Sequence, residues 1–313
     1  MEDLSIYGRK VAPVMNQSVS IDLATVDRLA DGRLGTHDVP CPLCGPFKSP
    51  HGQRRKVMRV WRVEPSFATF HCERCGESGY VRDQHASEPD SVRLAKAQAE
   101  AGERDRIHRA DRLSKARWLW SRRRPIAGTI AERYLRDARG ITCPFPATLG
   151  FLRANPDKGY PPAIIAAFGL AHETEPGVVA IADDAVRGVH ITRLLPDGSD
   201  RERGDKAKIM IGHSTGSPLV LAPSNDLAGL AVTEGIEDAL TMHEATGLGA
   251  WAAGCASRLL AFADAIPDYI ECVTVVVDDD PDGHRHSAAL AERIQARGIE
   301  VRLIVPNRWR EAS

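Results

Sequence analysis

Short apolar runs alternate with amphipathic stretches from residue 229 to the end of the chain. Compact apolar runs predict buried strands, and apolar residues three and four positions apart predict helices. Strands are expected at residues 230–235, 249–254, 272–280 and 300–306, and helices at 236–247, 257–267 and 284–298. Strands that alternate with helices of this length imply a parallel sheet with crossover connections, so this segment is α/β.

The middle of the chain has a different pattern. Residues 90–124 are polar, Ala-rich and charged, which predicts one or two exposed helices acting as a linker. A further helix is expected at 128–137. Strands punctuated by Pro and Gly then follow at residues 163–171, 177–184, 187–199 and 207–212. This order predicts a mixed α+β segment between the linker and the parallel sheet.

The N-terminal part combines a short helix with strand-like alternation. A helix is expected from Ile21 to Ala30, with Ser20 as its N-cap, and strands at Lys56–Val63 and Phe67–His71. The whole chain is therefore expected to be α+β. The expected segments are a leader with a helix (1–37), a cysteine-bearing module (38–86), a charged helical linker (87–125), an α+β segment (126–225) and a parallel-sheet domain (226–313).

Four of the seven cysteines form two C-x2-C pairs, and this spacing predicts structural zinc. Cys41 and Cys44 are separated by 27 residues from Cys72 and Cys75. A two-residue spacer lets both thiolates of a tight turn face one ion, and zinc takes four such ligands in tetrahedral geometry. A redox pair or free thiols would leave the duplicated spacing unexplained. A nearby histidine in place of one cysteine stays an alternative, with these candidates: His37, His51 and His71.

Composition adds a location and a charge pattern. With 43% hydrophobic and 27% charged residues the chain is an ordinary globular protein. It begins with acidic residues where a secretory signal needs basic ones, and no apolar run approaches the length of a membrane span. Paired cysteines without a signal favour a reducing compartment. We therefore expect a cytoplasmic protein with no membrane partner.

The net charge of −1 conceals basic segments. Arg54, Arg55 and Lys56 lie between the cysteine pairs, and we expect them to contact nucleic acid, because cations neutralise phosphates. The nearby aromatic residues are better assigned to a small core. From Arg109 to Arg124 seven cations stand against one acid. Trp118 and Trp120 in this stretch either contact nucleic acid or dock the linker helix, and docking is the favoured interpretation.

Acidic residues follow two of the predicted parallel strands. Glu234 ends the first strand, and Asp278 and Asp280 end the third. Because carboxyl ends of parallel strands meet at one edge of a sheet, these carboxylates should lie together. Asp278 and Asp280 should project to one side, a hard oxygen site suited to Mg²⁺. Asp after a strand is also a common turn former or helix N-cap, so the prediction depends on both acidic groups occurring in one βαβ frame.

These residues resemble the Toprim family, which is shared by primases, topoisomerases and some nucleases. The family pattern of Glu-Gly followed by Asp-x-Asp and Gly is read here at Glu234-Gly235, with Asp238 continuing the first motif, and at Asp278-x-Asp280 with Gly283. The resemblance covers residues 226–307. It implies catalysis with Mg²⁺ or Mn²⁺, held by Glu234, Asp278 and Asp280. Whether Glu234 is a metal ligand or a general base stays open.

The preceding segments resemble other parts of primases. Residues 187–198 are similar to a strand and turn in the N-terminal half of the primase catalytic core, and Lys206 and Lys208 to its basic strip. The cysteine module is similar to the primase zinc ribbon, although Tyr80 stands where many primases have Asp. The helical part that often completes the core is not found after the fourth predicted strand.

This order of modules implies a DNA primase that synthesises short RNA primers on single-stranded DNA from ribonucleoside triphosphates. The resemblance implies that Arg193, Lys206 and Lys208 contact the triphosphate or the template. No nucleotide-binding P-loop is found, so unwinding would belong to a separate helicase. Two alternatives remain: a Toprim nuclease that uses water as nucleophile, and a non-catalytic zinc-ribbon protein that binds DNA.

Overall fold

The computed structural model describes residues 21–46, 48, 50–75, 77–83, 91–204 and 206–306. The chain forms two compact units, residues 1–104 and 105–313. Ser20, the expected N-cap, lies outside the described residues.

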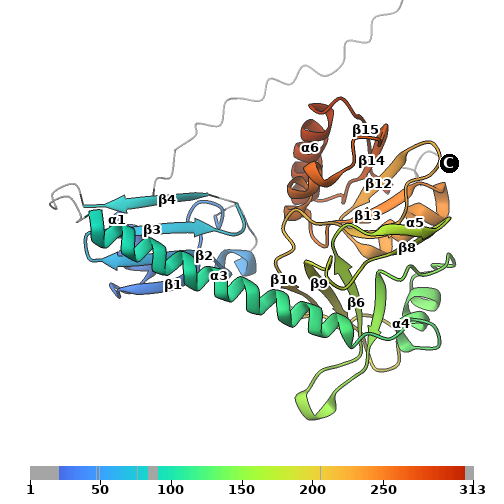
Figure 1. Cartoon of the computed structure of the whole chain (residues 1–313), viewed down its shortest axis with the longest axis horizontal. Coiled ribbons are helices and arrows are strands. Elements are labelled where there is room, and N and C mark those ends of the chain that lie inside the picture. The colour runs from blue at the N-terminus through green and yellow to red at the C-terminus, as the bar shows by residue number, and fades with distance from the viewer. Residues whose placement is uncertain are drawn as a thin grey trace, which may run out of the picture. The chain divides into compact units, whose positions relative to one another are not determined.

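The first unit is built on a four-stranded antiparallel sheet (Figure 1). Its strands run in the order β1 (Gly35–Pro40), β2 (Lys56–Glu64), β3 (Phe67–Cys72) and β4 (Ser78–Arg82). The two inner strands confirm the sequence prediction. The outer strands were not predicted, because their exposed edges carry no sustained apolar alternation: the burial of β4 is confined to Val81.

Two short helices accompany this sheet, α1 (Leu23–Leu29) and α2 (Pro50–Arg54). The expected start of the first helix was too early. The Asp22 side chain accepts a hydrogen bond from the Thr25 backbone N–H at 2.8 Å, so Asp22 is the N-cap. Val26 of α1 is buried in a small core with Met58 and Val60 of β2. Near this core the buried Arg62 guanidinium pairs with the Asp27 carboxylate.

Among the described residues, nine strands of the second unit form one sheet. Its order is β10-β9-β6-β11-β13-β12-β14-β15, with β5 paired to β6. The strands are β5 (Leu149–Leu152), β6 (Ala163–Phe168), β9 (Gly188–Arg193), β10 (Lys208–Gly212), β11 (Leu219–Ala222), β12 (Gly229–Thr233), β13 (Gly249–Ala252), β14 (Cys272–Val276) and β15 (Glu300–Ile304). The strands β7 (His172–Glu175) and β8 (Val178–Ala180) form a separate two-stranded sheet.

The half of this sheet nearest the C-terminus is parallel, as the sequence predicts. Strands β13, β12, β14 and β15 run parallel to one another, in that order. Helix α5 (Ile236–Thr246) connects β12 to β13, and α6 (Pro281–Gln295) connects β14 to β15. The helix expected at 257–267 is two 3₁₀ segments, Ala256–Arg258 and Leu260–Ala265. A 3₁₀ turn places residues three apart on one side, and Leu259 and Phe262 are accordingly both buried.

The other half is antiparallel and continuous with the parallel half. Strand β11 pairs antiparallel with both β6 and β13, so hydrogen bonds cross the expected boundary between residues 225 and 226. The mixed α+β class with a parallel-containing sheet near the C-terminus is confirmed. The expected segment boundaries stay predictions.

Helices cover both faces of the antiparallel half. Helix α3 (Ser91–Ser121) is one continuous helix of 31 residues, and its Ala116 and fully buried Trp120 pack with Ile165 of β6 and Val189 of β9. Trp120 therefore docks the helix, whereas Trp118 is 54% exposed. The opposite face packs against α5 and against α4 (Ile130–Arg133), which continues as a π-helical turn at Tyr134–Ala138. No helix in the described part of the chain is both long and apolar enough to cross a membrane.

Candidate metal centre and acidic site

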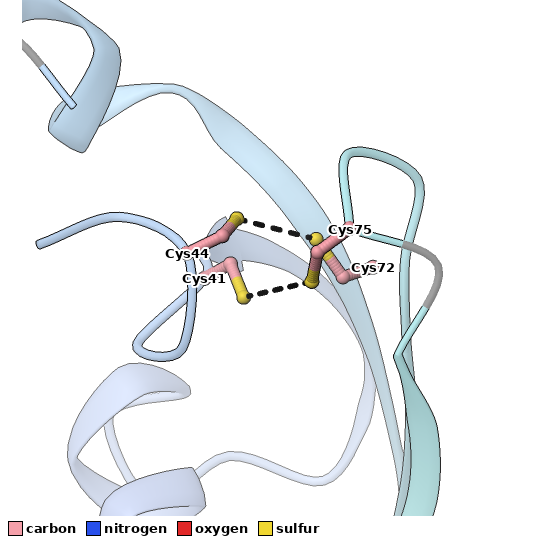
Figure 2. A group of neighbouring side chains, drawn as sticks. All are labelled: Cys41, Cys44, Cys72 and Cys75. Carbon is pink, nitrogen blue, oxygen red and sulfur yellow. Dashed lines mark hydrogen bonds between the residues drawn. The ribbon is translucent and has the colours of Figure 1, made fainter. Parts of the chain in front are cut away.

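The four predicted zinc ligands lie together at one end of the first unit (Figure 2). Their sulfur atoms are all within 4.8 Å of one another. The Cys41 and Cys75 Sγ atoms are 4.0 Å apart, and those of Cys44 and Cys72 are 3.9 Å apart. Tetrahedral zinc with Zn–S bonds of about 2.3 Å requires sulfur atoms about 3.8 Å apart. The four cysteines therefore have the spacing that a zinc ion needs.

Local backbone geometry builds this quartet. The Gly45 N–H donates to the Cys41 carbonyl at 2.9 Å and closes the first C-x2-C turn, where a side chain at residue 45 would collide with that carbonyl. A glycine is thus required at residue 45 because the backbone approaches itself closely there, and its φ is not positive. Burial raises the pKa of Cys44 to about 11 and also raises the pKa of Cys72, so a bound cation is needed to keep these thiols ionised.

Two of the three histidines considered as zinc ligands form hydrogen bonds to residues outside the cysteine quartet. His37 Nε2 bonds to the backbone oxygen of Arg33 at 3.0 Å, and His71 Nδ1 bonds to Ser78 Oγ at 2.7 Å. The His51 side chain lies outside the described residues. Arg54, Arg55 and Lys56 are exposed on α2 and at the start of β2.

Glu234 lies at the carboxyl end of β12 in a loop held by three hydrogen bonds. The Gly254 N–H donates to the Glu234 carbonyl at 2.9 Å, and the Ala253 N–H donates to the Thr233 carbonyl at 3.0 Å. The buried Thr233 hydroxyl donates to the Gly235 carbonyl at 2.6 Å. A Cβ at Gly235 would lie 2.5 Å from Asp238 Oδ2, so Gly235 leaves room for the Asp238 carboxylate beside Glu234.

Asp278 brings a second carboxylate to this edge from the end of β14. Its carboxylate lies near enough to Glu234 that burial, together with the Asp278 charge, raises the pKa of Glu234 to about 7. Burial and Asp278 also raise the pKa of Asp238. Oxygen ligands that repel one another in this way suit a hard divalent cation, which would relieve the repulsion.

Asp280, the third predicted ligand, has a structural contact of its own. Its Oδ1 accepts a hydrogen bond from the Gly283 N–H at 2.7 Å and caps α6. Asp279 turns away to His284 Nε2 at 2.8 Å, and Asp282 bonds to Arg285 at 2.6 Å. Among the described residues, the acids do not form a compact group of three ligands as the cysteines do. A cation here would complete its shell with water and substrate oxygens.

Of the three predicted core cations, Lys208 is the one that the structure relates to the acids. The positive charge of Lys208 lowers the pKa of Glu234 and of Asp238, against the larger effects of burial and of Asp278. Arg193 at the end of β9 pairs with Glu202 at 3.9 Å, and Lys206 is exposed in the turn before β10.

Comparison with known families agrees with this geometry. Residues 229–312 match the family description "Toprim domain". The C-terminal segment is a Toprim domain. Residues 110–221, which precede it, match a domain of unknown function, DUF7146. The acidic edge of the Toprim domain contains Glu234, Asp238 and Asp278, whereas Lys208 belongs to the preceding DUF7146 segment.

The chain also aligns with a solved structure. The crystal structure of the Aquifex aeolicus primase, comprising zinc-binding and RNA polymerase domains, aligns with a TM-score of 0.43 and 16% identity. The alignment covers 91% of this chain and 77% of that one. No curated protein sequence matches the chain.

Sequence reasoning missed a second carboxylate in the first turn of α5. Glu237 of the Toprim domain accepts a hydrogen bond from the Tyr134 hydroxyl at 2.7 Å. Its position beside Asp238 in the motif was the available signal, but a first-turn Glu on a helix is usually a solvated residue. Only the folded chain brings Tyr134 to it.

Proposed function

We propose that the protein is a DNA primase that synthesises short RNA primers on single-stranded DNA. The observation that supports this most strongly is that the Glu234 and Asp278 carboxylates lie near each other at the carboxyl edge of a Toprim domain. The four-cysteine ribbon in the same chain supports a primase over other proteins with a Toprim domain, because ribbons serve nucleic-acid recognition.

In this proposal Glu234, Asp278 and Asp280 hold Mg²⁺ or Mn²⁺. The ion would bind the triphosphate and stabilise the charge that develops when the 3′-hydroxyl displaces pyrophosphate. Glu234 is either a further ligand or the general base for that hydroxyl. Lys208 would bind a phosphate near the acids. Lys206 and Arg193 would extend the basic surface toward the triphosphate or the template.

The ribbon would select the site on the template where synthesis begins. Arg54, Arg55 and Lys56 are exposed cations in the first unit, suited to single-stranded phosphates. Zinc held by Cys41, Cys44, Cys72 and Cys75 would keep this module folded. In this proposal a separate replicative helicase would supply the single strand.

The test is incorporation of labelled ribonucleotides on single-stranded circular DNA with Mg²⁺ or Mn²⁺. Wild type should give short RNA products, and Asp278→Asn should reduce synthesis at least about a hundredfold, because one charged ligand is lost. Asp279→Asn is the matched control, since the Asp279 carboxylate pairs with His284 and should be dispensable. Synthesis by Asp278→Asn at the wild-type rate would refute the assignment.

The same assay separates the two alternative functions. Cleavage of the DNA by wild type with a divalent cation and no nucleotides would indicate a Toprim nuclease. Binding of single-stranded DNA without any metal-dependent reaction would indicate an accessory protein.

A further inference from the structure

Glu237 is a partly buried carboxylate to which the proposed chemistry assigns no role. It follows Ile236, which is buried, and it precedes Asp238 in the first turn of α5. Its Oε1 atom accepts the hydrogen bond from the Tyr134 hydroxyl at 2.7 Å. Tyr134 itself is fully buried at the start of the π-helical turn.

Tyr134 is in turn held by a chain of contacts. Arg139 Nε donates to the Tyr134 hydroxyl oxygen at 2.9 Å, and Arg139 Nη2 donates to Asp200 Oδ1 at 2.6 Å. The Tyr134 hydroxyl therefore accepts one hydrogen bond, from Arg139, and donates one, to Glu237. These three residues belong to the DUF7146 segment, whereas Glu237 belongs to the Toprim domain.

Strand register places Lys208 on the same side of the sheet as this chain of contacts. Lys208 pairs with Thr192, and Met210 pairs with His190. Directly paired residues on antiparallel strands project to one face, and residues two apart share that face. Met210 packs against the core formed with Tyr134 and α5, so Lys208 emerges on the face that α5 covers.

Charge complementarity agrees with this placement. Although burial disfavours the ionised form, the Lys208 ammonium group and the Tyr134 hydroxyl hold the pKa of Glu237 below its ordinary value. Lys208 is thus within electrostatic range of Glu237 as well as of the acids Glu234 and Asp238.

A partly buried carboxylate of this kind is not explained by stability. Desolvation of a buried charge offsets most of the attraction to its partners, and apolar replacements of similar volume are often neutral or stabilising. The neighbours Ile236, Ala239 and Leu240 are buried and apolar, so this turn of α5 would pack without a charge. The charge and its hydroxyl donor therefore need a functional reason.

We propose that Glu237 is a positioning residue that holds the Lys208 side chain at the acidic edge, with Tyr134 and Arg139 fixing the Glu237 carboxylate. The inference rests on the proposed function, in which Lys208 binds the triphosphate of the incoming nucleotide. In this inference the DUF7146 segment contributes directly to the Toprim site. It supplies Lys208, and it supplies Tyr134 and Arg139, which orient the Glu237 carboxylate.

The experiment measures nucleotide binding separately from synthesis. Equilibrium binding of a fluorescent ATP analogue with Ca²⁺ would be compared in wild type, Glu237→Gln, Tyr134→Phe and Lys208→Gln. Glu237→Gln and Lys208→Gln should each weaken binding about tenfold, and Tyr134→Phe by a smaller factor, since it removes one charge-assisted hydrogen bond. Glu244→Gln is the matched control. Glu244 also ties α5 to the preceding segment, through the Thr142 N–H at 2.9 Å, but at the far end of the helix.

Kinetics and thermal unfolding then distinguish positioning from a structural role. If primers are made, Glu237→Gln should raise KM for ribonucleotides with kcat changed by less than about twofold. Its melting temperature should equal that of Glu244→Gln. Addition of Lys208→Gln to Glu237→Gln should weaken binding no further, because the two residues act as one unit.

Each outcome decides the inference independently of the proposed function. Weakened binding in Glu237→Gln with no primer synthesis by wild type would keep the positioning role and refute the primase. Primer synthesis with unchanged nucleotide binding in Glu237→Gln and Tyr134→Phe would keep the primase and refute the positioning role. A wild type that binds no nucleotide would refute the inference outright.

Discussion

At the scale of single residues, the second unit contains one histidine whose neutral form is imposed by its surroundings. His190 of β9 is 2% exposed and packs edge-on against Phe168, with Gly254 close to its ring. Burial, reinforced by the Lys208 and Arg258 charges and opposed by Glu237, lowers the pKa of His190 to about 4. The unfolded chain should titrate near 6.5, so the imidazole couples stability to pH.

Because the folded-state pKa of His190 is lowered, the unfolded chain takes up a proton first as the pH falls through 6.5. The folded protein follows only near pH 4, so this residue costs stability as the pH falls between these values. At pH 5 the loss should be about 2 kcal/mol. Urea unfolding at pH 7 and pH 5 measures it, and His190→Gln should be less sensitive to pH by that amount. Equal sensitivity in both proteins would contradict this assignment of the lowered pKa.

Residue types near the acids were largely predictable, but their partners were not. The motif predicts Glu234 and Asp278, and the structure brings the two carboxylates near enough to shift the pKa of Glu234. The contact between Glu237 and Tyr134 spans 103 positions in sequence, and no local pattern indicates it. Likewise, the alternation of strand residues gives no reason to expect Lys208 opposite α5.

At the scale of secondary-structure elements, the junction between β14 and α6 combines two roles. The strand ends at Val276, and Asp280 begins the helix as its N-cap with Pro281 in the first turn. Gly283 packs so closely on the Asp278 backbone that a side chain there would collide with it. The proposed metal ligand and the helix cap therefore share a turn of a few residues, and substitutions at residue 280 can separate the two roles.

Asp280→Asn and Asp280→Ala should have different consequences. Asn keeps an N-capping oxygen for the Gly283 N–H, so its melting temperature should match wild type, whereas Ala should cost about 1 kcal/mol of stability. Both remove the carboxylate, so both should reduce primer synthesis. Thermal unfolding and ribonucleotide incorporation measured on the same samples check this. Full activity in Asp280→Asn would leave residue 280 with the capping role alone.

Element types followed from the sequence where the hydrophobic pattern was strong. The parallel strands and the two amphipathic helices α5 and α6 were expected, because buried strands read as continuous apolar runs. The strands β5 and β11 were missed. Both are four residues long, and β11 lies between Pro218 and Pro223, where turn residues dominate the local pattern.

At the scale of the whole molecule, the two units have separate cores and should respond differently to loss of zinc. The small core of the first unit includes Cys41 and Cys72, both nearly fully buried, so the metal site and the core are one structure. The second unit has its own extensive cores on both faces of the nine-stranded sheet.

Chelation of zinc, or Cys72→Ser, should unfold the first unit and leave the second unit folded. Structural zinc supplies much of the folding free energy of small domains of this kind, and the second unit makes no use of it. Limited proteolysis should then leave a resistant fragment that begins near residue 105. Metal analysis should give one zinc ion per wild-type chain. Uniform protease resistance after chelation would contradict a structural zinc.

The sequence by itself determined the four thiols, the acidic motif and the order of the modules, because each depends on short-range spacing or on local periodicity. Tertiary structure decided that the DUF7146 segment and the Toprim domain share one sheet through β11, and that Tyr134, Glu237 and Lys208 lie on one face of it. The physical reason is that strand order and buried polar contacts join residues far apart in the chain. They are selected by burial of the whole sheet and leave no periodic signal in the sequence.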